Sequence, residues 1–195
     1  METTTWHWIR HGPTHEKAFV GWRDVPADLS DTDRIARLRA SLPDKAVLVA
    51  SDLQRASATA TAIDAGHHRL NDHPDLREFN FGEWDGKHSD EITQTHPELS
   101  RAYWKTPGDV IPPGGESWNM AAARVARTVE EIMQTHRGRD IIAVAHFGVI
   151  LTQVQAAMGI DARAVLAHKI EPLSLTRIAF HGDGRTEVQV INHQP

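Results

Sequence analysis

Short, unbroken runs of apolar residues recur along the chain and predict the buried strands of a sheet. Residues 46–50 are one such run, and residues 140–145 contain a second one after Asp140; polar residues flank both. A strand that is apolar on both sides suits a parallel sheet covered on both faces. A third run, residues 5–9, ends at Arg10 before a Gly-Pro turn signal, and therefore predicts a third strand.

Segments with apolar positions at helical spacing separate these runs. Ser30 and Ser117 are suitable N-caps for two of the predicted helices. In the second of these helices we expect Met120, Val125, Val129, Ile132 and Met133 to face the core. The predicted helices run from Ser30 to Pro43, from Arg55 to Ala65, over one or two short stretches from His88 to Trp104, from Ser117 to about His136, and from Val149 to Met158.

The C-terminal part of the chain predicts a β-hairpin. Residues 173–180 and 186–192 read as strands, and His181-Gly182-Asp183-Gly184 between them is a strong turn signal. The hairpin should extend the sheet at an antiparallel edge. We therefore predict an α/β fold, a three-layer sandwich whose mostly parallel central sheet is flanked by helices, with an antiparallel edge strand at the C-terminus.

The length of 195 residues suits one domain, which we expect to span residues 1–195. Residues 79–118 mix carboxylates, aromatics, glycines and prolines. Such a segment is poor material for regular structure and typical of a loop near a functional site. We expect it to form a lid or a substrate wall over the sheet.

Composition and charge narrow the classes of partner. Hydrophobic residues make up 40% and charged residues 24% of the chain, and the net charge is -5. This acidic balance argues against nucleic acid or an anionic membrane as a partner. The absence of Cys, of a signal sequence and of a long apolar run favours a cytoplasmic protein. A homodimer stays open as an oligomeric state.

The 13 histidines raise the question of a metal site, because His7, His11 and His15 are four residues apart. That spacing aligns side chains only on a helix, and the Gly-Pro pair after His11 interrupts a helix there. We therefore expect no metal site.

Basic and imidazole side chains follow three of the predicted strands. Arg10 and His11 follow the first, Arg55 lies just beyond the second, and His146 follows the third. Ligands bind outside the carboxyl ends of the strands in open α/β sheets, so these side chains should converge there. Guanidinium groups bind phosphate oxygens, and helices expected after Gly12 and His146 would add N–H donors. The pattern predicts a site for phosphate or another tetrahedral anion.

Several motifs in this order resemble those of the histidine phosphatase superfamily, the phosphoglycerate mutase-like proteins. They span most of the chain, and their order is more specific than any one of them. The motifs are Arg10-His11-Gly12-Pro13-Thr14, the stretch from Ser51 to Ala60, the stretch from Leu76 to Gly86, Pro113-Gly114-Gly115-Glu116-Ser117, and Val144-Ala145-His146-Phe147-Gly148.

The resemblance implies a role for five residues. His11 would be the nucleophile that becomes phosphorylated, and Glu78 would donate a proton to the leaving alcohol. Arg10, Arg55 and a protonated His146 would hold the phosphoryl oxygens, replacing the metal ion of many phosphoryl-transfer enzymes. No cofactor is implied. Glu78 needs a raised pKa for this task, which its apolar neighbours would supply by desolvation.

The residues alone leave alternatives for four positions. Arg55 pairs with Asp52 in one alternative, and His146 caps its helix in another. Glu83 competes with Glu78 as the acid. Glu116 is expected to stabilise the first turn of the helix that follows it, without a part in the chemistry.

Substrate binding is assigned to Gly12, Thr14, Lys17, Trp22 and Phe147. Gly12 permits close approach of the chain. Lys17 stands where many members of the family carry Asn, and Phe147 stands where Gly is frequent, so both bear on specificity. Trp22 lies on a loop and is suited to wall a pocket.

Three functions fit these residues. The first is a metal-independent phosphomonoester hydrolase that acts on a small phosphorylated metabolite through a phosphohistidine. The second is a cofactor-dependent phosphoglycerate mutase, which is less favoured because the segment before the long helix is compact and carries few cations. The third is a module that binds phosphorylated ligands without turnover.

Overall fold

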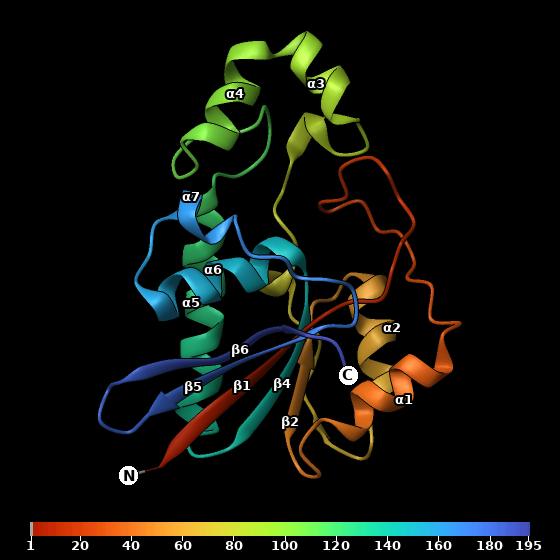
Figure 1. Ribbon diagram of the computed structural model, residues 1–195, viewed down its shortest axis with the longest axis vertical. Helices are drawn as coiled ribbons and strands as arrows, with labels where there is room; N and C mark the ends of the chain where they lie inside the picture. The colour runs from red at the N-terminus through yellow and green to blue at the C-terminus, as the bar shows by residue number, and fades with distance from the viewer. Residues whose placement is uncertain (1) are drawn as a thin grey trace.

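The computed structural model describes residues 2–195, which form a layered α/β fold (Figure 1). Its strands are β1 (Thr3–Arg10), β2 (Val47–Ala50), β3 (His68–Arg69), β4 (Asp140–Ala145), β5 (Leu175–His181) and β6 (Thr186–His193). Its α-helices are α1 (Thr32–Ala40), α2 (Gln54–Ile63), α3 (Ser89–Thr95), α4 (Pro97–Lys105), α5 (Trp118–Thr135), α6 (Phe147–Met158) and α7 (Ala162–Val165). Two 3₁₀ turns, η1 (Pro74–Leu76) and η2 (Gly82–Trp84), lie between β3 and α3.

The strands within residues 2–195 form one six-stranded sheet in the order β3-β2-β4-β1-β5-β6. The first four strands of this order are parallel, and the β5–β6 hairpin adds two antiparallel strands at one edge. β4 lies between β2 and β1, in a register that pairs Arg10 with Ala145 and Ala50 with Val144. The carboxyl ends of these three strands therefore meet at one edge, as predicted.

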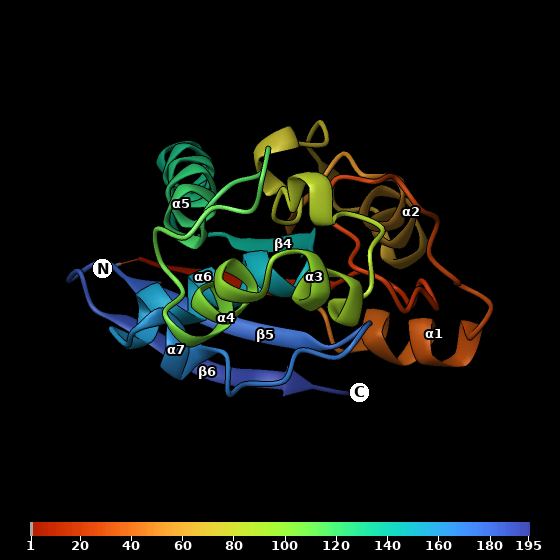
Figure 2. The same ribbon diagram turned by 90° about the horizontal axis from the view of Figure 1, so that it is seen from above.

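Helices cover both faces of this sheet (Figure 2). Neighbouring side chains of a strand point to opposite faces and therefore enter different cores. Trp6 and Trp8 of β1 belong to a core completed by α5 and α6. Ile9 belongs to a second core, completed by α1 and α2. The predicted three-layer α/β architecture with an antiparallel C-terminal edge is confirmed.

Several local predictions were wrong. Asp31, not Ser30, caps α1, because its carboxylate accepts a hydrogen bond from the Arg34 main-chain nitrogen at 3.0 Å. Met120 of α5 is 52% exposed and lies outside the core. The two-residue strand β3 and the single-turn helix α7 are too short to leave a periodic pattern in the sequence.

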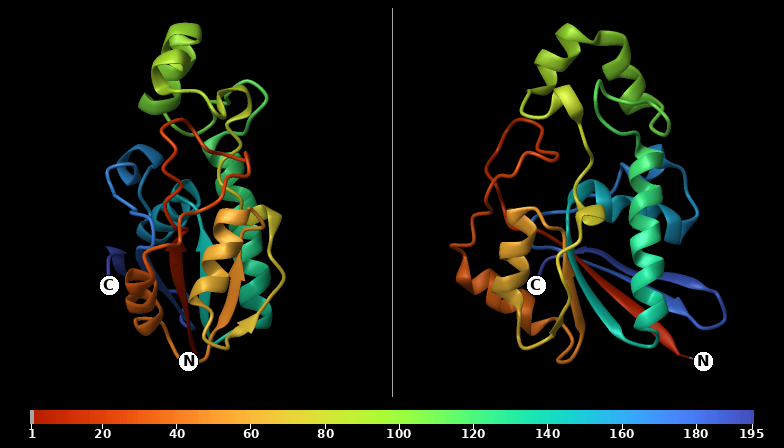
Figure 3. Two further views of the ribbon diagram at one scale, coloured as in Figure 1. Left: turned by 90° about the vertical axis from the view of Figure 1, so that its right-hand side faces the viewer. Right: turned by 180° about the vertical axis from the view of Figure 1, so that it is seen from behind.

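The segment 79–118 carries α3 and α4 away from the sheet, beyond the carboxyl ends of the strands (Figures 1 and 3). A small apolar cluster of its own includes Trp84, Ile92 and Tyr103. Main-chain hydrogen bonds join it to the loop between β1 and α1, since Phe19 N donates to Lys87 O and Gly86 N donates to Phe19 O. Among the described helices, none combines the length and apolarity that crossing a bilayer requires.

Candidate active site

Two histidines meet where β1 and β4 end. His11 directly follows β1 and His146 directly follows β4, and their ring centroids are 5.1 Å apart. His11 is 6% exposed and His146 is fully buried. The parallel pairing of the two strands brings these side chains together although they are far apart in the sequence.

His11 is held in one tautomer. Its Nδ1 lies 2.7 Å from the main-chain carbonyl oxygen of Gly12. A carbonyl only accepts hydrogen bonds, so Nδ1 carries the proton and Nε2 keeps its lone pair. Burial, followed by the charges of Arg55 and Arg10, lowers the pKa of His11 to about 3. At neutral pH, His11 is therefore an uncharged imidazole with a nucleophilic Nε2.

The surroundings of His146 also favour an uncharged side chain, whereas the resemblance implies a protonated one. Burial lowers the pKa of His146 well below its ordinary value, and His11 and the nearby arginines lower it further. Its position is the N-cap of α6, but its side chain makes no capping hydrogen bond. Neither ring nitrogen has a hydrogen-bond partner within residues 2–195. A neutral imidazole has one N–H available to an anion.

Two guanidinium groups flank the histidines. Arg10 donates from Nη1 to the Ile170 carbonyl oxygen at 2.6 Å. Arg55 donates from Nη2 to the Gly21 carbonyl oxygen at 2.7 Å and from Nη1 to that of Arg23 at 3.0 Å. In the described part of the chain, the Nε atoms of Arg10 and Arg55 have no partner. Both guanidinium groups keep N–H donors for a tetrahedral anion.

Arg55 does not pair with Asp52, so that alternative is wrong. The carboxylate of Asp52 instead accepts two hydrogen bonds from Arg77, at 2.7 and 2.6 Å. Trp22 lies over Arg77, with the guanidinium carbon 5.2 Å from its ring centroid. The indole Nε1 of Trp22 donates to the main-chain carbonyl oxygen of Glu78 at 2.7 Å.

Glu78 is a buried carboxyl group beside these cations. Its Oε1 accepts hydrogen bonds from the main-chain nitrogens of Phe79 at 3.0 Å and Gly148 at 3.1 Å. Burial raises the pKa of Glu78, although both hydrogen bonds and the charges of Arg55 and Arg10 oppose this effect. Glu83, the alternative acid, is exposed. Glu78 is thus the carboxyl group with the environment of a general acid.

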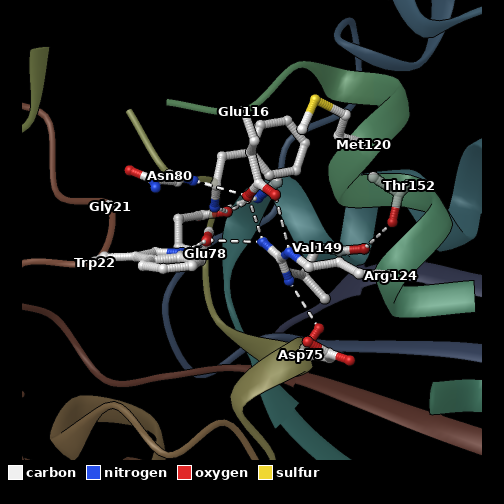
Figure 4. A network of polar contacts seen from close by, with 12 residues as sticks. Gly21, Trp22, Asp75, Glu78, Asn80, Glu116, Met120, Arg124, Val149 and Thr152 are labelled. Carbon is white, nitrogen blue, oxygen red and sulfur yellow. Dashed lines mark hydrogen bonds and ion pairs between the residues drawn. The ribbon is translucent and has the colours of Figure 1, made fainter. Parts of the chain in front are cut away.

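The main chain of Glu78 is held by a buried ion pair (Figure 4). Arg124 of α5 binds the carboxylate of Glu116 through Nε at 3.0 Å and Nη2 at 2.6 Å. The same guanidinium donates to the carbonyl oxygens of Glu78 at 2.9 Å and Asp75 at 2.7 Å. Glu116 also accepts from the Asn80 main-chain nitrogen at 2.8 Å. Glu116 therefore links the segment around Glu78 to α5. The sequence predicted a different role for Glu116, the stabilisation of the first turn of this helix.

Gly12 begins a long loop, and the helix expected directly after it does not form. The main-chain nitrogen of Gly12 donates to Thr59 Oγ1 at 3.0 Å. A Cβ atom at Gly12 would lie 2.7 Å from Leu29 Cδ2 and 3.1 Å from the Asp28 carbonyl oxygen. The absence of a side chain at Gly12 thus allows the start of this loop to pack closely against residues 27–29 near its end.

The other predicted specificity residues differ in their proximity to the site. Phe147 is half-buried, and the guanidinium carbon of Arg10 lies 5.5 Å from its ring centroid. Thr14 is half-buried on the loop after Gly12. Lys17 is exposed, and in the described residues it forms no hydrogen bond or ion pair with the other site residues.

Three residues at this site escaped the sequence reasoning: Arg124, Thr59 and Gly148. Arg124 left a signal, since it occupies a core-facing position of α5 between Ala121 and Thr128, where an arginine needs a buried partner. Thr59 and Gly148 lie within two of the family motifs, but the motifs do not reveal their contacts. Thr59 Oγ1 accepts a hydrogen bond from the main-chain nitrogen of Gly12, and the main-chain nitrogen of Gly148 donates to the carboxylate of Glu78.

The remaining polar clusters and grooves lie elsewhere. His7 binds Asp140 and His15 binds Asp28, at 2.8 and 2.7 Å. Within the described residues, no group of three or more histidines and carboxylates is arranged to hold a metal ion. A groove of about 730 Å³ lies between α5, α6 and the β5–β6 hairpin, and none of the predicted site residues lines it.

The chain is similar to known proteins in sequence and in fold. The sequence matches the profile of the histidine phosphatase superfamily (branch 1) over residues 7–193. The bifunctional protein Rv2228c of Mycobacterium tuberculosis is 31% identical over 174 residues, which are 89% of this chain and 46% of that protein. The metal-independent phosphoserine phosphatase of Arabidopsis thaliana is 35% identical over 103 residues, 51% of this chain and 43% of that protein. This chain thus spans less than half the length of these two curated relatives.

Among solved structures, Bacillus stearothermophilus YhfR shares the fold over nearly its whole length. The TM-score is 0.88 at 27% sequence identity, and the match covers 97% of each chain.

Proposed function

Because the chain belongs to the histidine phosphatase superfamily (branch 1), we propose that it hydrolyses phosphomonoesters of small molecules through a phosphohistidine at His11. The observation that carries this proposal is the hydrogen bond from His11 Nδ1 to the Gly12 carbonyl oxygen, which leaves Nε2 unprotonated. Arg10 and Arg55 lie close enough to act on both His11 and the buried carboxyl group of Glu78. Such a group of side chains suits covalent phosphoryl transfer.

In the first step, His11 Nε2 attacks phosphorus and forms a P–N bond as the P–O bond to the leaving alcohol breaks. Glu78 donates its proton to the alcohol oxygen, which is why its raised pKa matters. Arg10, Arg55 and neutral His146 donate hydrogen bonds to the phosphoryl oxygens and stabilise their charge.

In the second step, water attacks the phosphohistidine. The Glu78 carboxylate takes a proton from this water, the P–N bond breaks, and inorganic phosphate leaves. Both residues return to their starting protonation states, so the cycle is balanced.

Metal independence belongs to the same proposal. The two guanidinium groups supply positive charge of the kind that a metal ion supplies in other phosphoryl-transfer enzymes. The relative named metal-independent phosphoserine phosphatase supports this part of the proposal. We further propose that residues 79–118 act as a lid or substrate wall within a single domain, since this segment directly follows Glu78.

Alkaline-quench labelling with a ³²P-phosphomonoester tests the proposal, because the P–N bond of phosphohistidine survives in alkali and hydrolyses in acid. We expect label on His11 and release of inorganic phosphate in the presence of a metal chelator. His11→Asn should abolish both, whereas the control His15→Asn should keep both, because His15 is exposed and bonded to Asp28. Isomerisation of 3-phosphoglycerate without phosphate release would establish the mutase alternative, and binding without labelling would establish the non-catalytic module.

A further inference from the structure

A small apolar cavity lies directly beside the carboxyl group of Glu78. Its volume is about 50 Å³, and its walls come from the segment after Glu78, from α4 and α5, and from residues near α6 and α7. The side chains that shape it are those of Phe81, Tyr103, Trp104, Trp118, Phe147 and Leu166. Segments far apart in the sequence thus combine into one aromatic wall.

We propose that this cavity is the subsite for the leaving group and that it selects phosphomonoesters of apolar alcohols. The inference rests on the proposed function, because that function makes Glu78 the proton donor to the alcohol oxygen. A general acid must lie within hydrogen-bond reach of the atom that it protonates. The first carbons of the alcohol therefore lie against the groups next to Glu78, which are the cavity walls.

The chemistry of these walls favours an uncharged alcohol. No Lys, Arg or His side chain is among the described residues that line the cavity, and Glu78 supplies its single carboxyl group. The polar end of Trp118 is already satisfied, since its Nε1 donates to Gln155 Oε1 at 2.6 Å. A carboxylate on the leaving group would lose its hydration here without gaining a cation. A glycerate or serine leaving group is therefore disfavoured.

Trp104 gives the cavity a partly open side. It is 43% exposed, and its ring stacks on Phe19 of the β1–α1 loop, with centroids 6.0 Å apart and an interplanar angle of 28°. Tyr103 meets Trp104 edge to face at 5.1 Å. An alkyl chain that outgrows the cavity can therefore continue along an exposed aromatic surface.

The test uses the purified protein with ethyl, propyl and butyl phosphate. Their leaving alcohols have closely similar acidity, so differences in kcat/KM report contacts of the alkyl chain. We expect kcat/KM to rise about fourfold per methylene group, or roughly 15-fold from ethyl to butyl phosphate. Phosphoserine and 3-phosphoglycerate should react at least about tenfold more slowly than butyl phosphate, because their charged groups remain unpaired.

Trp104→Ala supplies the matching variant. It should flatten the ethyl-to-butyl series, whereas Ile111→Ala should leave the series as steep as in the wild type. Ile111 is a similarly exposed apolar residue of the same segment, at 46%, and does not line the cavity. Far-UV circular dichroism checks that both variants are folded.

The outcomes separate the two proposals. A flat series in the wild type, a steep series in Trp104→Ala, or faster turnover of phosphoserine or 3-phosphoglycerate would each overturn the apolar subsite while His11 labelling stands. Failure of every ester to label His11 or to release phosphate would overturn the proposed function, and the subsite with it.

Discussion

Arg124 donates a hydrogen bond to the main-chain carbonyl oxygen of Glu78 at 2.9 Å, although 46 positions separate the two residues. The Trp22 indole donates to the same oxygen at 2.7 Å. Glu78 is thus held by its main chain, while its carboxyl group faces the main-chain nitrogen of Gly148. The position of the proposed acid depends on α5 and α6 and on the β1–α1 loop.

The ion pair of Arg124 with Glu116 makes a first prediction. Arg124→Met should lower the free energy of unfolding by about 3–5 kcal/mol, because the Glu116 carboxylate stays buried without its partner. The double variant Glu116→Gln, Arg124→Met should recover part of this stability. It should still turn over butyl phosphate more slowly than the wild type, on the order of tenfold, because Glu78 has lost its main-chain anchor.

The measurement for this pair is the ratio of kcat/KM for butyl phosphate to kcat/KM for 4-nitrophenyl phosphate, whose leaving group needs no proton. Arg127→Met, at an exposed position of the same helix, is the control and should keep the wild-type ratio. A wild-type ratio in the double variant would show that the pair only stabilises the fold.

Removal of the Glu78 carboxyl group makes a second prediction. Glu78→Gln should lower kcat/KM for butyl phosphate by about 10²–10⁴-fold and should affect kcat/KM for 4-nitrophenyl phosphate much less, because kcat/KM reports the step in which the alcohol leaves. In the wild type, alkyl phosphate hydrolysis should fall as the pH rises through the raised pKa of Glu78, because the acid form is lost. Steady-state rates of butyl phosphate hydrolysis across pH test this expectation. If the rate of Glu78→Gln falls with rising pH as the wild-type rate does, Glu78 is not the group that titrates.

Buried His11 makes a third prediction, on stability against pH. Its pKa is lowered to about 3 in the folded state, so below pH 6.5 the unfolded chain binds a proton that the folded chain does not. The stability contribution is present above that pH and declines as the pH falls toward 3. From pH 7 to pH 5, the contribution of His11 should lower the free energy of unfolding by about 2 kcal/mol. Urea unfolding at pH 7 and pH 5 measures this. Between these two pH values, the free energy of unfolding of the wild type should fall by about 2 kcal/mol more than that of His11→Gln.

Gly148 makes a fourth prediction. A Cβ atom there would lie 2.6 Å from Glu78 Oε1 and 3.0 Å from the Phe79 ring. Gly148→Ala should displace the carboxyl group, lower stability by about 1–3 kcal/mol and slow the hydrolysis of alkyl phosphates. Gly159→Ala, at the left-handed C-cap of the same helix with a φ of 64°, should lower stability by about 1–2 kcal/mol without slowing hydrolysis. Similar kinetics of the two variants would contradict this assignment.

The sequence was sufficient for the fold and for the residues that meet at the strand ends. Unbroken apolar runs identify β2 and β4 as buried parallel strands, and parallel strands must align their carboxyl ends. His11 and His146 therefore had to lie at one edge of the sheet. This part of the site depends on local patterns and on general rules of sheet topology, which a sequence carries directly.

Tertiary packing alone decided the surroundings that give these residues their chemistry. The tautomer of His11, the neutral state of His146 and the raised pKa of Glu78 depend on burial and on groups from distant segments. The partners of Arg55, the anchoring by Arg124 and the aromatic cavity depend on contacts between elements that no local pattern encodes. The physical reason is that desolvation and hydrogen bonding act through space, at distances that are set only when α5, α6 and the segment 79–118 pack together.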